Sequence, residues 1–316
     1  MKRRVAALAA LALLSRVSSG CRAQDSGAPV VLSTDCGADI DDQWALAHLL
    51  LSPELDLRAV ITSHASSIQL SSADSARCAA GVIEKVLPSG ASHRPSVAPG
   101  STLPLENTTT PRENSGVDLL LRISADFAES RRLVVFVIGA GTDVASALLV
   151  DPTIAKRIKI VAMGFDEWPA GGDGFNIKND PLAWQVILDS DAPIVIGSSA
   201  VTKRDLRLTR AEAAAVMRSH GPVGEYLDSL FDQWLSQRAD LVKLLVAPDT
   251  WVVWDEVVVA YALGLTTGNE VPRPRLEPSF SFSHPETTRR ITWVEHIDTG
   301  KVWADFTQKI DARRAN

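Results

Sequence analysis

The chain has 316 residues, of which 46% are hydrophobic and 22% are charged, so it can bury the core of one large domain or two smaller ones. This composition excludes a disordered or low-complexity protein. It carries 32 Lys and Arg residues against 38 Asp and Glu residues, a formal net charge of −6. An acidic chain is poorly suited to contacts with phosphates, and we expect no nucleic-acid partner.

The N-terminus has the order of a secretory signal peptide. Lys2, Arg3 and Arg4 precede the apolar run VAALAALALL, and small and polar residues follow. We expect cleavage after Ala23, export to the periplasm or the medium, and a single mature α/β domain over residues 24–316. The apolar run is too short for a permanent membrane span. Because SSGC loosely resembles a lipobox, a lipoprotein anchored at Cys21 is the alternative.

Two cysteines remain in the predicted mature chain. Cys36 falls in a loop rich in carboxylates, and Cys78 falls in a predicted helix. Although an oxidising compartment would allow them to pair, we expect two free and mostly buried thiols.

Apolar runs of strand length alternate with helical patterns along the first two thirds of the chain. The predicted strands cover residues 29–34, 56–62, 133–138, 158–163 and 193–197, and the predicted helices cover 42–51, 70–86, 115–129, 142–150 and 180–190. Residues 92–116, rich in Pro, Ser, Thr and Asn, read as a long loop. This alternation predicts an open, mostly parallel sheet flanked by helices, with a Rossmann-like core.

The last third of the chain is mainly helical in pattern. Residues 209–246 form a helical stretch that Gly221 and Pro222 divide, and Asp255 opens a further helix. Residues 290–309 read as short strands followed by a final turn.

Four carboxylates follow the first predicted strand. The segment VLSTDCGADIDDQWAL (31–46) contains Asp35, Asp39, Asp41 and Asp42. Carboxylates this close repel one another, and a divalent cation would offset that repulsion. Oxygen ligands favour Ca²⁺ or Mg²⁺ over zinc. The alternative, a helix N-cap, requires only one of these residues.

Four segments together resemble the nucleoside hydrolase family. TDCGADIDD is similar to the family's Asp-rich signature. IGAGTDVASAL, MGFDEWPAGGDGFNIKNDPLAW and WDEVVVAYAL follow in the family's order, so the resemblance covers about residues 29–265. It implies a nucleoside hydrolase-like fold and the calcium-dependent hydrolysis of ribonucleosides to free base and ribose. It also implies a possible homodimer or homotetramer.

The resemblance implies roles for particular residues. It implies a Ca²⁺ ion held by Asp35, Asp42, Asp255 and the backbone carbonyl of Thr142. Asp35 would be the general base that deprotonates the attacking water. The sugar contacts would come from Asn176 and from Asp41, although a two-residue insertion leaves open whether Asp39 or Asp41 faces the ribose.

Several positions depart from the family pattern, and three of them fall at expected substrate contacts. Ser67, or its neighbour Ser66, stands in place of a ribose-binding Asn, and Gly174 stands in place of a sugar-binding Glu, for which Asp173 or Asp166 could partly substitute. Trp254 replaces the His that protonates the leaving base in many members. Purine-specific members also have Trp there, which suggests purine preference through stacking. The alternative is that Trp254 is a core residue.

These departures leave two further functions open. One is a non-catalytic exported protein that binds a sugar or nucleoside with its metal. The other is a hydrolase acting on another N-ribosyl or glycosidic substrate.

Overall fold

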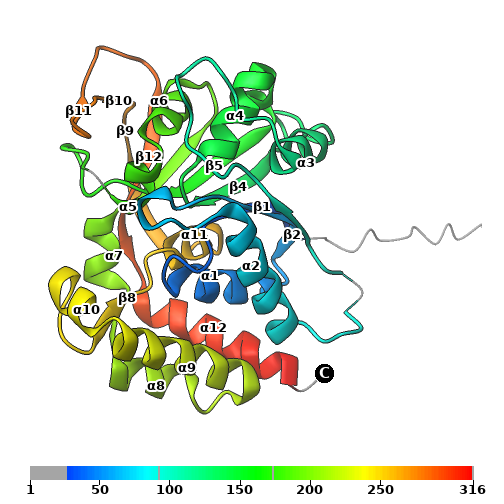
Figure 1. The fold of residues 1–316 in the computed structure, drawn as a ribbon, viewed down its shortest axis with the longest axis vertical. Helices are drawn as coiled ribbons and strands as arrows, with labels where there is room; N and C mark the ends of the chain where they lie inside the picture. The colour runs from blue at the N-terminus through cyan, green and yellow to red at the C-terminus, as the bar shows by residue number, and fades with distance from the viewer. Residues whose placement is uncertain (1–26, 92, 173, 315–316) are drawn as a thin grey trace, which may run out of the picture.

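The computed structural model describes residues 27–91, 93–172 and 174–314, so the predicted signal peptide and Asp173 lie outside the described residues. An eight-stranded sheet runs through the molecule in the order β3-β2-β1-β4-β5-β6-β12-β9 (Figure 1). The strands are β1 (Ala28–Thr34), β2 (Leu55–Thr62), β3 (Ser96–Pro99), β4 (Leu133–Ile138), β5 (Ile158–Met163), β6 (Ile194–Gly197), β9 (Thr266–Pro272) and β12 (Arg290–Ile297). All neighbouring pairs are parallel except β12 and β9. The predicted open, mostly parallel α/β sheet is therefore confirmed.

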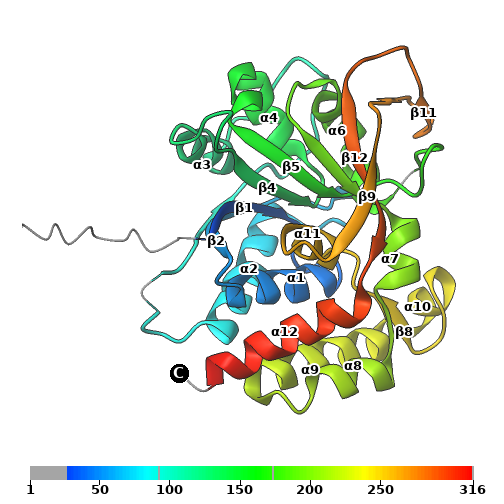
Figure 2. The same cartoon turned by 180° about the vertical axis from the view of Figure 1, so that it is seen from behind.

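Helices cover both faces of this sheet (Figure 2). One face carries α1 (Asp41–Leu51), α2 (Ser72–Val86), α11 (Glu256–Ala262) and α12 (Thr299–Arg314), with α8 (Arg210–Met217) and α9 (Gly221–Gln237) outside them. The other face carries α3 (Ser115–Ser124), α4 (Thr142–Val150) and α6 (Pro181–Asp189). Successive residues of β1 alternate between these two cores, with Val30 and Leu32 on one side and Val31 on the other. Burial on both faces explains why the strands read as continuous apolar runs.

Shorter elements connect these layers. They are η1 (Ser66–Ile68), η2 (Pro152–Lys156), α5 (Phe175–Asn179), α7 (Ser199–Asp205), α10 (Ala239–Leu245), and the paired strands β7 (Arg207–Thr209) with β8 (Thr250–Val252) and β10 (Arg275–Leu276) with β11 (Phe282–Ser283). Among the residues described, no helix has both the length and the apolar character needed to cross a bilayer.

The prediction that the chain ends in short strands and a final turn is wrong for its last part. After β12 the chain forms the sixteen-residue helix α12, which buries Val302, Phe306 and Ile310 at a spacing of four residues. This spacing is a helical signal that the sequence carries. The predicted loop over 92–116 contains β3, and the sequence also gave no sign of β9. Because β9 is a mostly exposed edge strand, its sequence TTGNEVP lacks an apolar pattern.

The expectation of two free thiols is also wrong, because Cys36 and Cys78 form a disulfide with their Cα atoms 5.7 Å apart. Helix α2 packs against α1, which brings Cys78 beside the β1–α1 turn. Gly37 adopts a φ of +99° there, and a side chain at that position would contact Cys78. The pairing depends on this tertiary approach, which sequence spacing does not reveal.

Candidate active site

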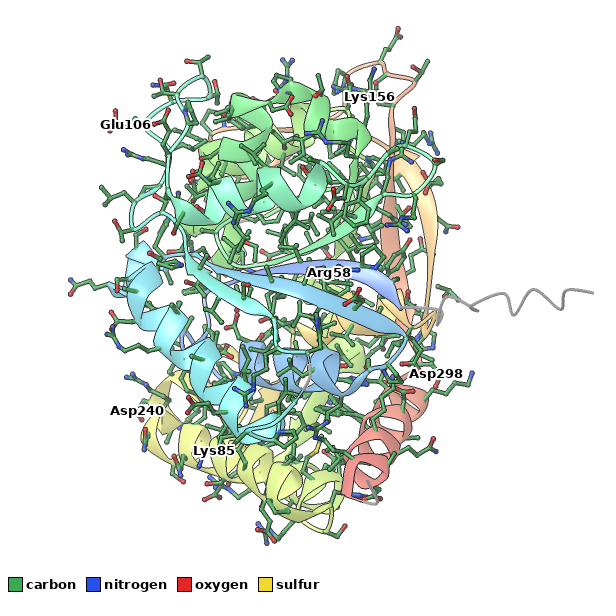
Figure 3. All side chains as sticks on the ribbon, turned by 90° about the vertical axis from the view of Figure 1, so that its right-hand side faces the viewer. Arg58, Lys85, Glu106, Lys156, Asp240 and Asp298 are labelled. Carbon is green, nitrogen blue, oxygen red and sulfur yellow. A yellow bond between two sulfur atoms is a disulfide. The ribbon has the colours of Figure 1, made fainter. Side chains whose placement is uncertain are left out.

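Four carboxylates are buried inside a protein whose other charges lie mainly outside. Charged side chains such as Arg58, Lys85 and Lys156 lie on the outer surface (Figure 3). By contrast, four aspartates are only 2–6% exposed: Asp35, Asp41, Asp42 and Asp255. All four line one cavity of about 380 Å³. Ile138 and Met163, the last residues of β4 and β5, line it too, so the cavity lies at the carboxyl ends of the parallel strands.

The turn between β1 and α1 carries Asp35, Asp41 and Asp42, and its hydrogen bonds hold the last two. Asp39 Oδ1 accepts the backbone N–H of Asp41 at 2.8 Å, and Asp41 Oδ1 accepts that of Asp42 at 3.1 Å. The Thr34 hydroxyl donates to Asp42 Oδ1 and accepts the Cys36 backbone N–H at 3.1 Å. The bonds from Asp41 and Asp42 use free N–H groups at the start of α1, where negative charge is favoured.

A close approach of two strand ends places Asp35 beside β4. A Cβ at Gly139 would lie 2.3 Å from Ser63 Oγ and 2.9 Å from the Asp35 backbone nitrogen. Only glycine therefore fits at this point of the β4–α4 turn.

Asp255 joins the cluster from the far end of the sequence. It is the N-cap residue of α11, and its backbone N–H donates to Asp41 Oδ2 at 3.3 Å. Carboxylate oxygens of Asp41, Asp42 and Asp255 all lie within 4.8 Å of one another. Helices α1 and α11 are also joined through His48 Nδ1 and Glu256 Oε1, which are 2.5 Å apart and fully buried.

The cluster is strained electrostatically without a cation. Burial and the Asp42 carboxylate raise the pKa of Asp35 well above the usual carboxyl range, and burial raises the pKa of Asp42 to about 8. Burial and the carboxylates of Asp42 and Asp35 likewise raise the pKa of Asp255. Desolvation and like charge both disfavour ionisation, so full ionisation requires positive charge nearby.

A hard divalent cation fits this donor set. The carboxylates supply only oxygen ligands, and Asp35 Oδ2 is buried without a hydrogen-bond partner. An orphaned buried oxygen costs free energy that a cation could recover. The site is therefore a candidate metal centre of the type that Ca²⁺ or Mg²⁺ occupies.

Thr142 does not line the cavity. It is the first residue of α4 and fully buried, and its hydroxyl donates to Asp180 Oδ2 at 2.7 Å and lies 3.0 Å from His64 Nε2. The residue of this segment that reaches the cavity is Ile138, at the end of β4.

Most of the residues expected to contact the sugar line the cavity, but Ser67 does not. Asn176, on α5, lines the cavity and donates from Nδ2 to the Met163 carbonyl at 3.1 Å. Asp39 and Gly174 also line it. Ser67 is exposed outside the cavity and its backbone N–H donates to Asn179 Oδ1, while the neighbouring Ile68 lines the cavity instead.

Tryptophans form one wall of the cavity. Trp254 is half-buried and lines the cavity, and its ring centroid lies 4.9 Å from that of Trp251 at an interplanar angle of 85°. Trp251 in turn lies 5.3 Å from Trp234 of α9. Sequence reasoning singled out Trp254 but missed the other two, because nothing in their local patterns relates them to the Asp-rich turn.

Two lysines also line the cavity and were not expected there. Lys178 lies on α5, and Lys203 lies on α7 within a basic run. Both are exposed, so they lie toward the solvent side of the cavity. Asp166, which the sequence offered as a partial substitute for the missing Glu, lines the cavity as well.

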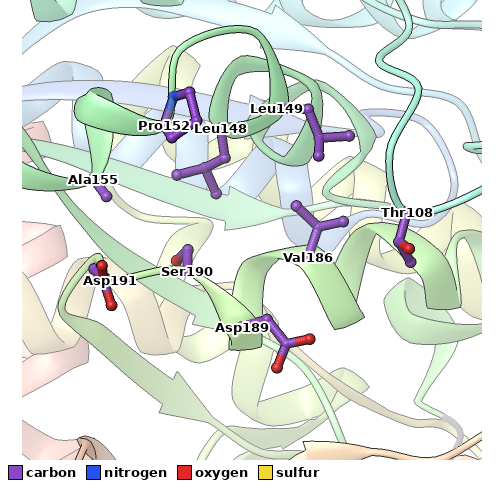
Figure 4. Close-up of a pocket in the computed structure, with 9 residues that line it drawn as sticks. All are labelled: Thr108, Leu148, Leu149, Pro152, Ala155, Val186, Asp189, Ser190 and Asp191. Atoms are coloured by element: carbon purple, nitrogen blue, oxygen red, sulfur yellow. The ribbon is translucent and has the colours of Figure 1, made fainter.

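A second cavity of about 340 Å³ lacks such chemistry (Figure 4). It lies between α4, η2 and α6, and its lining mixes apolar side chains, such as Leu148 and Val186, with polar ones. Its carboxylates are Asp189 and Asp191, and Asp191 lies 3.7 Å from Arg289. The Asp-lined cavity is therefore the candidate active site.

The chain is similar to known proteins in sequence and in fold. Residues 30–316 match the family model described as inosine-uridine preferring nucleoside hydrolase. The pyrimidine-specific ribonucleoside hydrolase RihA of Klebsiella pneumoniae is 27% identical over 227 residues, which are 65% of this chain and 71% of that protein. RihA of Escherichia coli is 27% identical over 234 residues, which are 67% of this chain and 73% of that protein.

Solved structures share the fold. The purine-preferring ribonucleoside hydrolase from Gardnerella vaginalis superposes with a TM-score of 0.73 and 20% identity, covering 90% of this chain and 98% of that one. The plant nucleoside hydrolase PpNRh1 superposes with a TM-score of 0.71 and 19% identity, covering 90% of this chain and 99% of that one.

Proposed function

Since this chain belongs to the inosine-uridine preferring nucleoside hydrolase family and is a hydrolase of N-glycosidic bonds, we propose that it releases the base from ribonucleosides with the help of a bound Ca²⁺ ion. The observation that carries the calcium part of this proposal is the buried convergence of Asp41, Asp42 and Asp255 beside Asp35. Family membership also argues against the alternative of a non-catalytic binding protein.

The ion would be held by the carboxylates of Asp35, Asp42 and Asp255. A backbone carbonyl from the β4–α4 segment would be a further ligand. The resemblance proposes Thr142 for this carbonyl, whereas Ile138 is the residue of the segment that lines the cavity. When bound, a divalent cation supplies the charge that neutralises the carboxylates and acidifies the attacking water. Asp35 would accept the proton of that water, because its Oδ2 has no other partner.

The remaining polar groups would serve the sugar. Asn176, with Asp39 and Asp41, would bind the ribose hydroxyls, and Ser67 and Asp173 stay as further candidates from the sequence. The developing charge on the sugar ring is positive, so carboxylates around it stabilise the transition state. The similar proteins include a pyrimidine-specific hydrolase and, among the solved structures, a purine-preferring one. Among neutral bases we propose purines for this chain, because Trp254 offers a large stacking face.

The compartment follows from two features of the chain. Its N-terminal segment has the order of a signal peptide, and disulfides persist in oxidising compartments. We therefore propose that the enzyme is exported.

Base release from inosine, guanosine, adenosine, uridine and cytidine tests the proposal. The purified protein should release base with added Ca²⁺ and lose that activity in EGTA. Asp35→Asn should lower kcat by roughly 10²–10⁴-fold, the range for loss of a general base. Asp118→Asn, an exposed aspartate on α3, is the matched control. Activity that survives both EGTA and Asp35→Asn would disprove the proposed mechanism.

A further inference from the structure

A buried histidine joins the helix that begins after Asp255 to the helix at the end of the chain. His48 of α1 is fully buried and lies between two carboxylates. Its Nδ1 is 2.5 Å from Glu256 Oε1 on α11, and its Nε2 is 2.8 Å from Asp305 Oδ2 on α12. None of these three residues lines the Asp-lined cavity, so none contacts a substrate there.

The surroundings of His48 fix the orientation of its ring. Both neighbours are carboxylates, which accept hydrogen bonds, so both ring nitrogens donate and the ring is cationic. Burial by itself would lower the pKa of His48, but the carboxylates of Glu256 and Asp305 outweigh burial and raise it. One face of the ring stacks on Phe306, with the centroids 4.2 Å apart and an interplanar angle of 3°. The imidazolium therefore cannot turn without losing a hydrogen bond or this stacking.

Helix α12 anchors the outer side of this arrangement. Lys309 Nζ lies 2.7 Å from Asp305 Oδ2 and 3.0 Å from Glu54 Oε2. It also donates to Ser52 Oγ at 3.0 Å, and the Ser52 hydroxyl donates to the His48 carbonyl at 2.8 Å. Asp305 is thus held by a cation on each side, and it keeps His48 in a defined place.

Glu256 depends on His48 alone. It is fully buried, and its Oε2 has no hydrogen-bond partner, so among the described residues His48 is the one group that bonds to this carboxylate. Burying such charges is costly, and apolar side chains in place of a buried ion pair often leave stability unchanged or higher. Stability by itself therefore gives little reason for the pair.

The pair joins the two helices whose first residues form the cation site. Asp42 and His48 lie on α1, and Asp255 directly precedes Glu256 at the start of α11. The Asp255 side chain makes no capping bond, so its direction depends on how α11 lies against α1. The Asp255 backbone N–H donates to Asp41 at 3.3 Å, and the His48–Glu256 bond is a second tie. Two directional ties oppose the rotation and sliding that apolar contacts permit.

We propose that His48 is a positioning residue for the metal site: it holds Glu256, and with it α11, so that the Asp255 carboxylate reaches the cation shared with Asp42. This inference rests on the proposed function, because the cation belongs to that function.

Two variants of Glu256 separate its hydrogen bond from its charge. Gln and Met are both neutral and have nearly the length of Glu, but only Gln keeps an oxygen that accepts the His48 Nδ1–H. We expect Glu256→Gln to bind Ca²⁺ within about threefold of the original protein and Glu256→Met to bind it about tenfold more weakly. Isothermal titration of the metal-free proteins measures both. Equal affinities in the two variants would overturn the inference.

A double variant distinguishes positioning from support of the fold. His48→Phe combined with Glu256→Met replaces the pair by apolar side chains and keeps a ring to stack on Phe306, while Asp305 keeps Lys309. We expect the thermal midpoint without calcium to lie near that of the original protein. Calcium affinity should stay about tenfold weaker, because no directional tie is restored. Affinity that returns together with the midpoint would show a purely structural pair and overturn the inference.

Hydrolysis of inosine separates this inference from the proposed function. Glu256→Met should need about tenfold more calcium for half-maximal activity, and most activity should return at saturating calcium, because the residues at the substrate are unchanged. His296→Phe removes a surface imidazole 3.1 Å from Asp205 and is the matched control, with no change expected. An unchanged calcium requirement in Glu256→Met would overturn this inference alone. Absence of calcium binding by the original protein would overturn the proposed function as well.

Discussion

At the scale of single residues, Thr34 determines how Asp42 is held. Its hydroxyl both donates to the Asp42 carboxylate and accepts the Cys36 backbone N–H, so one small side chain joins the strand end to the start of α1. Thr34 is fully buried, and no solvent can replace these bonds. It belongs to the Asp-rich segment, but sequence reasoning attended only to the carboxylates and missed it.

We expect Thr34→Val, which keeps the shape and removes the hydroxyl, to weaken calcium binding about tenfold, since an unsatisfied buried group costs about 1–3 kcal/mol. Calcium titration of the variant measures this. Thr34→Ser retains the hydroxyl and should bind nearly as well as the original protein. Equal calcium affinity in the Val and Ser variants would show that Thr34 does not position Asp42.

At the scale of elements, the disulfide ties the metal-site turn to α2. Cys36 directly follows Asp35 and is 1% exposed, while Cys78 lies within the 15-residue helix α2. The two cysteines are separated by 42 residues. Closing a loop of that length removes roughly 4 kcal/mol of chain entropy from the unfolded state. The bond therefore stabilises the fold and also limits movement of the turn that carries Asp35.

Reduction by dithiothreitol should accordingly lower the thermal midpoint and weaken calcium binding about tenfold. The double variant Cys36→Ser, Cys78→Ser should behave like the reduced protein and respond no further to dithiothreitol. A fall in the midpoint with unchanged calcium affinity would mean that the disulfide supports the fold but not the metal site.

The elements also show what the sequence could predict. Strands β1, β4 and β5 and helices α1 and α4 lie within a residue of their predicted bounds, because each buried apolar run determines its own local structure. The predicted helix over 115–129 ends earlier, at Ser124. The two strands of the main sheet that were missed, β3 and β9, are edge strands whose pairing depends on a neighbour.

At the scale of the whole molecule, the candidate site joins residues that only the fold can relate. Asp41 and Asp255 are 214 positions apart, yet one bonds to the backbone of the other. The resemblance to a family implied that Asp255 shares an ion with Asp35 and Asp42, and it assigned Asp41 to the sugar, whereas composition and spacing relate Asp255 to none of them. The tryptophan wall lay beyond both approaches, because Trp234 and Trp251 come from a helix and a short strand outside the recognised segments.

The cluster makes stability depend on pH in a definite direction. Burial raises the pKa of Asp42 to about 8, and burial with Asp42 raises that of Asp35. A carboxyl whose pKa is higher in the folded state contributes stability below its unfolded pKa and loses it as pH rises through the folded pKa. The calcium-free protein should therefore become less stable between pH 5 and pH 8.

Calcium binds the ionised carboxylates, so the rise in thermal midpoint that it causes should grow over the same pH range. At a calcium concentration 100 times Kd the gain is about 2.7 kcal/mol, or about 5 °C or more in the midpoint. Thermal scans with calcium and with EGTA at pH 5, 6, 7 and 8 measure it. A calcium shift that shrinks toward pH 8 would contradict the assignment of these carboxylates.

The central claim is that the aspartates of the β1–α1 turn and Asp255 hold one hard cation. Isothermal titration of the metal-free protein with Ca²⁺ at neutral pH tests it most directly. We predict one Ca²⁺ bound per chain and at least a tenfold weaker affinity in Asp255→Asn. Calcium uptake that is absent at millimolar concentration, or that is unchanged in Asp255→Asn, would contradict the claim.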